Sequence, residues 1–214
     1  MIAHLPAKTS FLRQPLHLCY SVLFAAFWLY TGLSTPDLKN WLLENTLSMV
    51  ILLVAFYNIL RFSDTSYTLI FLFLLLHVYG SQYQYAENPF GEWLKVQWHL
   101  QRNHYDRIVH LGFGLLLAYP MHEVFARGLG LRNFLGYLLP VEFILSLSAL
   151  YELVEWLVAD VAYDGARQGM VYLGMQGDVW DAQKDMGLAF IGALLAMCLT
   201  LILRRKRVQA VPKV

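Results

Sequence analysis

Charged residues are scarce in this chain, and their scarcity argues against an ordinary soluble domain. Asp, Glu, Lys and Arg make up only 14% of the 214 residues, whereas a soluble domain carries about 25%. Hydrophobic residues reach 58%, which indicates lipid rather than water as the main solvent. The formal net charge is +1, so the chain has no strong field to attract nucleic acid, and we expect no nucleic-acid partner.

Cysteine and the common short motifs are also sparse or missing. The two cysteines, Cys19 and Cys198, both lie within apolar segments, which argues against a disulfide framework and against cysteine as a metal ligand. The chain contains no GxGxxG, P-loop, CxxC or HExxH pattern. It shows no internal repeat and no linker rich in Pro, Gly or Ser. We therefore expect residues 1–214 to form a single integral membrane domain.

Long apolar segments are what the chain has in abundance. A transmembrane helix needs about 20 mostly apolar residues, and six segments come close to that length. They lie near residues 16–33, 41–60, 67–83, 106–126, 134–158 and 186–203. The first lacks a small-x-small cleavage site, so we interpret it as a retained span rather than a signal peptide. The sequence predicts an all-α polytopic membrane protein, a bundle of about six transmembrane helices.

The distribution of Lys and Arg predicts how this bundle is inserted. With six spans both termini share one side, and that side carries ten of the 16 basic residues. The tail RRKR at residues 204–207 is the strongest part of this signal. Because Lys and Arg collect in short cytoplasmic loops, we expect both termini to be cytoplasmic. Twelve of the 15 acidic residues fall toward the other side.

Three polar clusters lie within or directly beside the predicted spans. They are Asp106 with His110, Glu152 with Glu155, and Asp178, Asp181, Lys184 and Asp185. Residues three or four apart share a helix face, so each cluster presents its members together. The fourth and sixth spans start on the outside and the fifth ends there, which puts all three clusters at one depth. Ionisable groups in a membrane are costly unless they are paired or wet, so we expect one polar site near the outer boundary.

Two kinds of chemistry suit this predicted site. The candidate catalytic residues for acid–base work are Asp106, His110, Glu152, Glu155, Asp181 and Lys184. Asp178, Asp181 and Asp185 are candidate ligands for a hard divalent cation such as Mg²⁺. The structural alternative is a solvated helix start, where acidic side chains interact favourably with the helix dipole.

Residues 84–105 form a long aromatic loop before the fourth span. Asn88-Pro89-Phe90-Gly91 is typical of a turn, and the apolar residues after it predict an amphipathic helix over residues 88–102 at the membrane surface. That segment would be a lid or wall for the site, or a plain connector. The candidate lipid or substrate contacts are Trp93, Trp98, Gln176, Gln183 and Trp180.

The motifs YDRIVHLGFGLL, YELVEW and QGDVWDAQKDM occur in that order before an apolar last helix. With these motifs the chain resembles the YjdF-like family of bacterial inner-membrane proteins, which implies a location in that membrane. The pairs Asp106/His110, Glu152/Glu155 and Asp181/Asp185 are also similar to a pattern of VanZ-like proteins. Asp185 stands where that pattern usually has Asn.

Three functions are compatible with these observations. The first is binding of, or action on, a lipid or envelope precursor, with or without a metal ion. The second is proton- or cation-coupled transport or binding by the acidic residues. The third is a non-catalytic structural or regulatory membrane subunit. Beyond the lipid bilayer and such a lipid-linked substrate the sequence names no partner, and it leaves the oligomeric state open.

Overall fold

The computed structural model describes residues 14–46, 62–131, 133–162 and 173–209, and this part of the chain is helical without strands. A short helical segment also covers residues 38–46. The named helices are α1 (Pro15–Ser34), α3 (Asp64–Gln82), α4 (Pro89–Gln97), α5 (Tyr105–Gly128), α6 (Leu135–Ala162) and α8 (Asp181–Gln209). The predicted all-α membrane architecture is confirmed.

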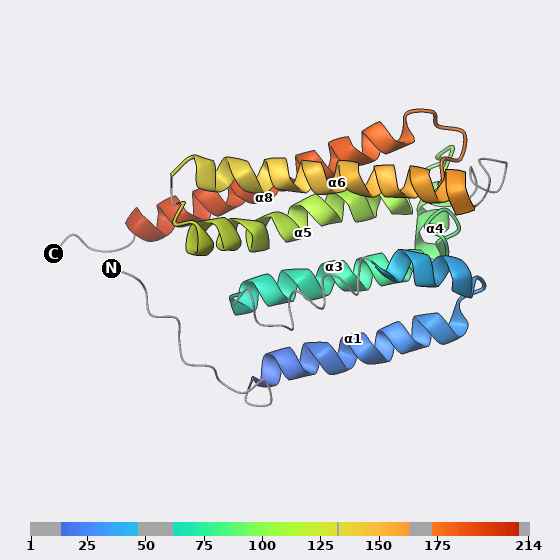
Figure 1. The fold of residues 1–214 in the computed structure, drawn as a ribbon, viewed down its shortest axis with the longest axis horizontal. Coiled ribbons are helices and arrows are strands. Elements are labelled where there is room, and N and C mark those ends of the chain that lie inside the picture. Colours follow the sequence, from blue (N-terminus) through green and yellow to red (C-terminus); the bar gives the residue numbers. More distant parts are fainter. Residues whose placement is uncertain (1–13, 47–61, 132, 163–172, 210–214) are drawn as a thin grey trace.

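The long helices lie side by side along one common axis (Figure 1). Helix α5 packs against α8, α3 and α6, and α1 packs against α3. Helices α5 and α8 run in the same direction, and α6 runs antiparallel to both and packs against both. The short helix α4 lies where α5 and α8 begin and α6 ends, and we call this the α4 end of the bundle. Helix α1 begins and α8 ends at the opposite end (Figure 1).

Four of the described helices are long and apolar enough to cross a membrane. They are Pro15–Ser34, Tyr105–Gly128, Leu135–Val161 and Asp181–Arg205, and they correspond to the predicted spans 16–33, 106–126, 134–158 and 186–203. Helix α3 covers the predicted span 67–83, but its polar first turn gives it a lower mean hydropathy and it is not among the four. The predicted span 41–60 lies mostly outside the described residues. The total of six spans stays a prediction.

The described helices combine a buried apolar core with many exposed large apolar side chains and several buried polar ones. Large apolar side chains such as Leu33, Leu199 and Ile202 are exposed along the bundle, whereas Glu44, His77, Asp185 and other polar side chains are buried. Such an arrangement suits a chain whose surroundings are lipid, because polar groups must then find partners inside the protein.

Exposed tryptophans collect around the α4 end. Trp93 and Trp98 belong to α4 and its C-cap, Trp156 lies in the last part of α6, and Trp180 directly precedes α8. Tryptophan is enriched at the membrane–water interface. These four side chains therefore indicate that the α4 end of the bundle lies at a membrane boundary.

Helices α5 and α8 cross at very close range because small residues face each other. A Cβ atom added at Gly114 would overlap the backbone carbonyl of Ala189, and one at Gly192 would overlap the carbonyl of Leu111. Small residues at such crossings let two backbones touch, as is common between membrane helices. The crossing fixes the register of the two parallel helices, and that register decides which polar residues meet at their beginnings.

Helix α8 begins at Asp181, five residues before the predicted start of the last span. Asp181 and Asp185 therefore share a helix face, as the sequence predicted. Asp178, however, lies in the turn before the helix and not on that face.

Candidate functional site

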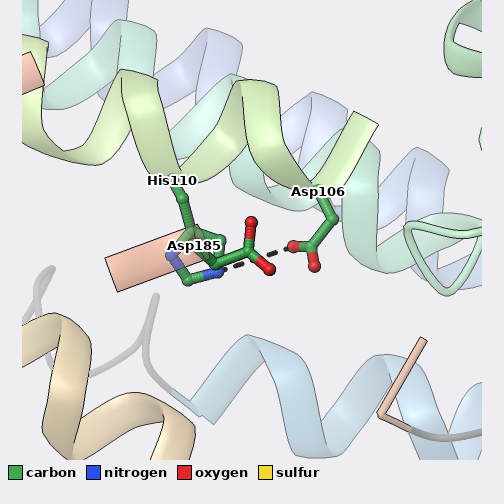
Figure 2. Close-up of side chains that lie close together, drawn as sticks. All are labelled: Asp106, His110 and Asp185. Carbon is green, nitrogen blue, oxygen red and sulfur yellow. Dashed lines mark ion pairs between the residues drawn. The ribbon is translucent and has the colours of Figure 1, made fainter. Parts of the chain in front are cut away.

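The contact of Gly114 with Ala189 brings His110 and Asp185 together. His110 lies one helical turn before Gly114 in α5, and Asp185 lies one turn before Ala189 in α8. Because the helices are parallel, these two side chains meet, and Asp106 lies one further turn back. One ligand-type atom from each of Asp106, His110 and Asp185 lies within 4.8 Å of the other two. Figure 2 shows the three side chains converging between α5 and α8.

Helix α6 supplies the other wall around His110. His110 Nε2 lies 3.4 Å from Glu152 Oε1 and 3.6 Å from Asp106 Oδ1. On the other side of the ring, His110 Nδ1 forms a hydrogen bond of 3.5 Å with Ser148 Oγ. Ser148 and Glu152 are one turn apart in α6, so a single face of that helix contacts both edges of the imidazole. The buried ring of His110 is thus held between the side chains of Asp106, Ser148 and Glu152.

Two arginines pair with the acidic residues at the start of α8. Arg102 donates its terminal nitrogens to both carboxylate oxygens of Asp181, with Nη2 at 3.1 Å from Oδ2. Arg107 Nη2 lies 2.5 Å from Asp178 Oδ2 and 3.2 Å from Asp181 Oδ1. Bidentate arginine–carboxylate pairs of this kind are strong and geometrically specific. Asp178 and Asp181 are thus partly neutralised by arginine.

Lys184 contacts Asp178 from the solvent side. Its Nζ donates to Asp178 Oδ2 at 2.6 Å, and about half of its side chain is exposed. The hydrogen bond from Lys184, together with the bond from Arg107, holds the pKa of the Asp178 carboxyl well below its usual range. Asp178 is therefore ionised at neutral pH.

Two carboxylate oxygens at the centre of this region lack a hydrogen-bond partner among the described residues. They are Asp185 Oδ1 and Glu152 Oε1, and both atoms are buried. The nearest basic atom to Asp185 Oδ1 is Arg107 Nε at 3.9 Å, beyond hydrogen-bonding range. Buried polar atoms without partners are rare in folded proteins, and these two oxygens have their hydrogen-bonding capacity unused by the described residues.

A second buried polar group lies next to this site. Tyr151 donates its hydroxyl hydrogen to Glu44 Oε2 at 2.6 Å, and His77 Nε2 donates to the carbonyl oxygen of Glu44 at 3.1 Å. His77 Nδ1 is then the acceptor for the Tyr85 hydroxyl at 2.6 Å. Glu155 is half-buried and interacts electrostatically with Glu44.

Two loops at the α4 end position Arg102. Asn103 N donates to Gln176 Oε1 at 2.9 Å and Gln176 Nε2 donates to Asn103 O at 3.0 Å, so the loop before α5 pairs with the loop before α8. Asn88 caps α4, and its carbonyl oxygen accepts a hydrogen bond from Asn103 Nδ2. Arg102 also donates to the carbonyls of Gly174 and Met175. The arginine is therefore fixed by backbone as well as by Asp181.

The structure brings together only part of the predicted site. Asp106, His110, Glu152 and Asp185 lie in direct proximity, and Asp178 and Asp181 form a neighbouring layer with the arginines. Glu155 lies instead with the Glu44 group. Lys184 and Gln183 are exposed at the start of α8. Gln176 has a structural contact with Asn103, while Trp93, Trp98 and Trp180 face outward.

Sequence reasoning overlooked Arg102, Ser148 and Tyr151. Nothing in the local pattern singles out a serine or tyrosine within an apolar helix. Arg102 had a weak signal, because several acidic residues at one depth require basic partners. Arg102 is the one arginine in the predicted outer loop before the fourth span, and Arg107 lies at the start of that span.

Comparison with known proteins identifies the family of the chain. Residues 16–206 match the family model described as "Predicted membrane protein (DUF2238)". The chain belongs to the DUF2238 family. A relative of this DUF2238 protein is the inner membrane protein YjdF of Escherichia coli (strain K12), which is 38% identical over 174 residues, covering 78% of this chain and 79% of the relative. The predicted YjdF-like membership is thereby confirmed, whereas the resemblance to VanZ-like proteins finds no support. No solved structure matches the chain.

Proposed function

We propose that this DUF2238 protein is a bacterial inner-membrane protein that binds or acts on a lipid or envelope precursor at the α4 end of its bundle. The name of its Escherichia coli relative supports the location. The exposed tryptophans support a membrane boundary at the α4 end. The excess of Lys and Arg on the side of the termini favours cytoplasmic termini, so that the site faces outward.

The observation that carries this proposal is the placement of His110 between two carboxylates. Its Nε2 lies within 3.6 Å of both Asp106 and Glu152, and the unpartnered Oδ1 of Asp185 is adjacent. A histidine flanked by carboxylates can accept a proton from a bound group and return it. At this depth the substrate would present a polar head to His110 while its apolar part stays in the membrane.

Helix α4 supplies a surface for the apolar part of such a substrate. Phe90 and Trp93 stack with ring centroids 5.8 Å apart, and both are exposed together with Val96. The opposite face of α4, with Gly91 and Leu94, is buried against the bundle. An amphipathic helix of this kind lies in the interfacial plane with its apolar face toward acyl chains.

The test compares the envelope lipids and lipid-linked precursors of cells that lack the protein with cells that produce it. Mass spectrometry should show a precursor that accumulates or disappears in the deletion strain. Native protein should restore the profile, and His110→Gln should not. Glu92→Gln on the exposed side of α4 is the matched control and should restore it. An unchanged profile in the deletion strain would refute the proposal and favour a structural subunit.

The orientation has its own test. A reporter enzyme that is active only in the periplasm, fused after Val214, should remain inactive, because the tail RRKR keeps the C-terminus in the cytoplasm. The same reporter inserted after Trp98, in the loop at the α4 end, should be active. The reverse pattern would place the site on the cytoplasmic side.

The Glu44 group favours a second candidate function, movement of protons. The Tyr151 hydroxyl donates to the Glu44 carboxylate, and the Tyr85 hydroxyl donates to His77, which contacts the backbone carbonyl of Glu44. Buried ionisable groups of this type mark proton relays in membrane proteins. Purified protein in liposomes with a pH gradient would then collapse the gradient faster than Glu44→Gln protein. Equal rates in the two preparations would argue against this candidate.

A further inference from the structure

We propose that Asp106, His110 and Asp185, with Glu152 as the fourth ligand, bind a divalent first-row transition-metal ion. This metal site rests on the proposed function and deepens it by naming a cofactor; a bound ion would occupy His110 Nε2 and would polarise the bound polar head group in place of proton transfer by His110. It rests on the arrangement of atoms described above, and it can be tested without any lipid substrate.

The spacing of the ligand atoms suits one ion. One atom from each of Asp106, His110 and Asp185 lies within 4.8 Å of the others, and Glu152 Oε1 lies 3.4 Å from His110 Nε2. Metal–ligand bonds to nitrogen and oxygen are about 2.0–2.2 Å long, so opposite ligands around one ion are about 4.4 Å apart. Movements of a few tenths of an ångström would therefore close the site.

The buried oxygen of Asp185 is an independent indication that a ligand binds. The Asp185 side chain is only 3% exposed, and its Oδ1 has no hydrogen-bond partner in the described part of the chain. Figure 2 shows this carboxylate pointing into the space between Asp106 and His110. Glu152 Oε1 is a second buried atom without a hydrogen bond, and it faces the same histidine. A metal ion would satisfy both oxygens at once.

The charges around the cluster favour a dication. Arg102 and Arg107 pair with Asp178 and Asp181, and Lys184 pairs with Asp178. Apart from His110, Asp106, Asp185 and Glu152 have no comparably close basic side chain among the described residues, and the shortest distance to an arginine atom is 3.9 Å. Three carboxylates at close range repel one another. A divalent ion would offset most of that repulsion.

The histidine is oriented for coordination through Nε2. When Nδ1–H donates to Ser148 Oγ, Nε2 carries no hydrogen and presents its lone pair to Asp106 and Glu152. Metal-binding histidines typically donate their other ring nitrogen to a neighbouring group in this way. One imidazole with three carboxylates favours Mn²⁺, Fe²⁺ or Zn²⁺ over Mg²⁺ and Ca²⁺, which prefer oxygen ligands.

This ligand set differs from the one that the sequence suggested. Asp178, Asp181 and Asp185 were expected to hold Mg²⁺ together. The oxygens of Asp178 and Asp181 instead accept hydrogen bonds from Lys184 and the two arginines. Only Asp185 of that set is available, and it points toward Asp106 and His110.

The experiment measures metal binding to the purified full-length protein in detergent. Metal content after dialysis against Mn²⁺ or Zn²⁺, and binding curves from Mn²⁺ electron paramagnetic resonance, should give one tight site per chain. Asp185→Asn and His110→Ala should each weaken binding at least tenfold. Asp178→Asn tests the alternative ligand set and should leave the affinity within about threefold, as should the surface control Glu92→Gln. Size-exclusion chromatography identifies the variants that are folded.

The outcomes separate this inference from the proposed function. One bound ion that depends on Asp185 and His110 supports the site, whether or not the envelope lipids of deletion cells differ. Native protein that binds no more metal than Asp185→Asn overturns it and leaves an acid cluster that shares protons. Binding that depends on Asp178 but not on His110 also overturns it. If Asp185→Asn does not fold, Asp106→Asn gives the same comparison.

Discussion

Arg102 donates to both carboxylate oxygens of Asp181, although 79 positions separate the two residues in the chain. Each side chain is only 6% exposed. This pair ties the loop before α5 to the first residue of α8 and closes the α4 end of the bundle. Both carboxylate oxygens of Asp181 thereby accept hydrogen bonds from Arg102.

Removing one partner of this pair should destabilise the protein strongly. Arg102→Ala leaves the Asp181 charge buried without its bidentate partner, and loss of one partner of a buried pair costs about 3–5 kcal/mol. The apparent melting temperature of the purified protein should fall clearly. The double variant Arg102→Ala with Asp181→Ala should lose less than the two single variants summed. Strict additivity in folded protein would contradict the pairing.

The close crossing of α5 and α8 predicts a steric effect at Gly114. Gly114→Ala places a methyl group against the backbone carbonyl of Ala189 and should push the helices apart, at a cost of about 1–3 kcal/mol. Because the same crossing sets the register of His110 and Asp185, the variant should also weaken metal binding.

Gly187→Ala is the matched control, since an added Cβ there has no neighbour within 4 Å. It lies in α8, two residues after Asp185, and should be neutral or stabilising by up to about 1 kcal/mol because alanine favours the helix. Thermal unfolding and Mn²⁺ binding of both variants check the prediction. Equal effects of the two substitutions would contradict the proposed role of the crossing.

Glu123 should stabilise the opposite end of the bundle. This buried carboxylate accepts hydrogen bonds from Ser63 N at 2.9 Å and from Ser66 Oγ at 2.5 Å, at the start of α3. Bonds to a charged group contribute about 1.5–3 kcal/mol, so Glu123→Gln should lower the melting temperature. Glu142→Gln on the exposed face of α6 should not. A similar loss in both variants would mean that Glu123 does not hold α3.

The stability of the protein should depend on pH through His104. Partial burial and the neighbouring Arg107 and Arg102 lower the pKa of His104 below its usual value. The unfolded chain then binds a proton more readily than the folded one, so stability is full above about pH 6.5 and is lost as the pH falls below that value. In His104→Gln protein the melting temperature should therefore fall less between pH 7.5 and 5.5 than in the native protein.

His99→Gln provides the control for that pH dependence. His99 lies in the same loop and is exposed, so its replacement should leave the curve of melting temperature against pH like that of the native protein. A native curve that His104→Gln does not flatten would contradict the predicted shift.

The amino-acid sequence by itself determined the helices and the depth of the site. Hydropathy along the chain located the first, fourth and fifth of the six predicted spans to within a few residues of the described helices, because a transmembrane helix requires a continuous apolar segment. The alternation of span directions then placed Asp106, Glu152 and Asp181 at one end of the bundle without further information. The predicted start of the last span was less accurate, because the first turn of α8 is polar and gives no hydropathy signal.

Only the tertiary structure decided which of these acidic residues meet. The contact of Gly114 with Ala189 sets the register of α5 and α8, and a different crossing would bring another turn of α8 to His110. Arg102 and Arg107 pair with particular carboxylates because two loops that are far apart in sequence come together in space. Contacts across helices follow from backbone approach and side-chain volume in three dimensions, and a one-dimensional pattern records neither.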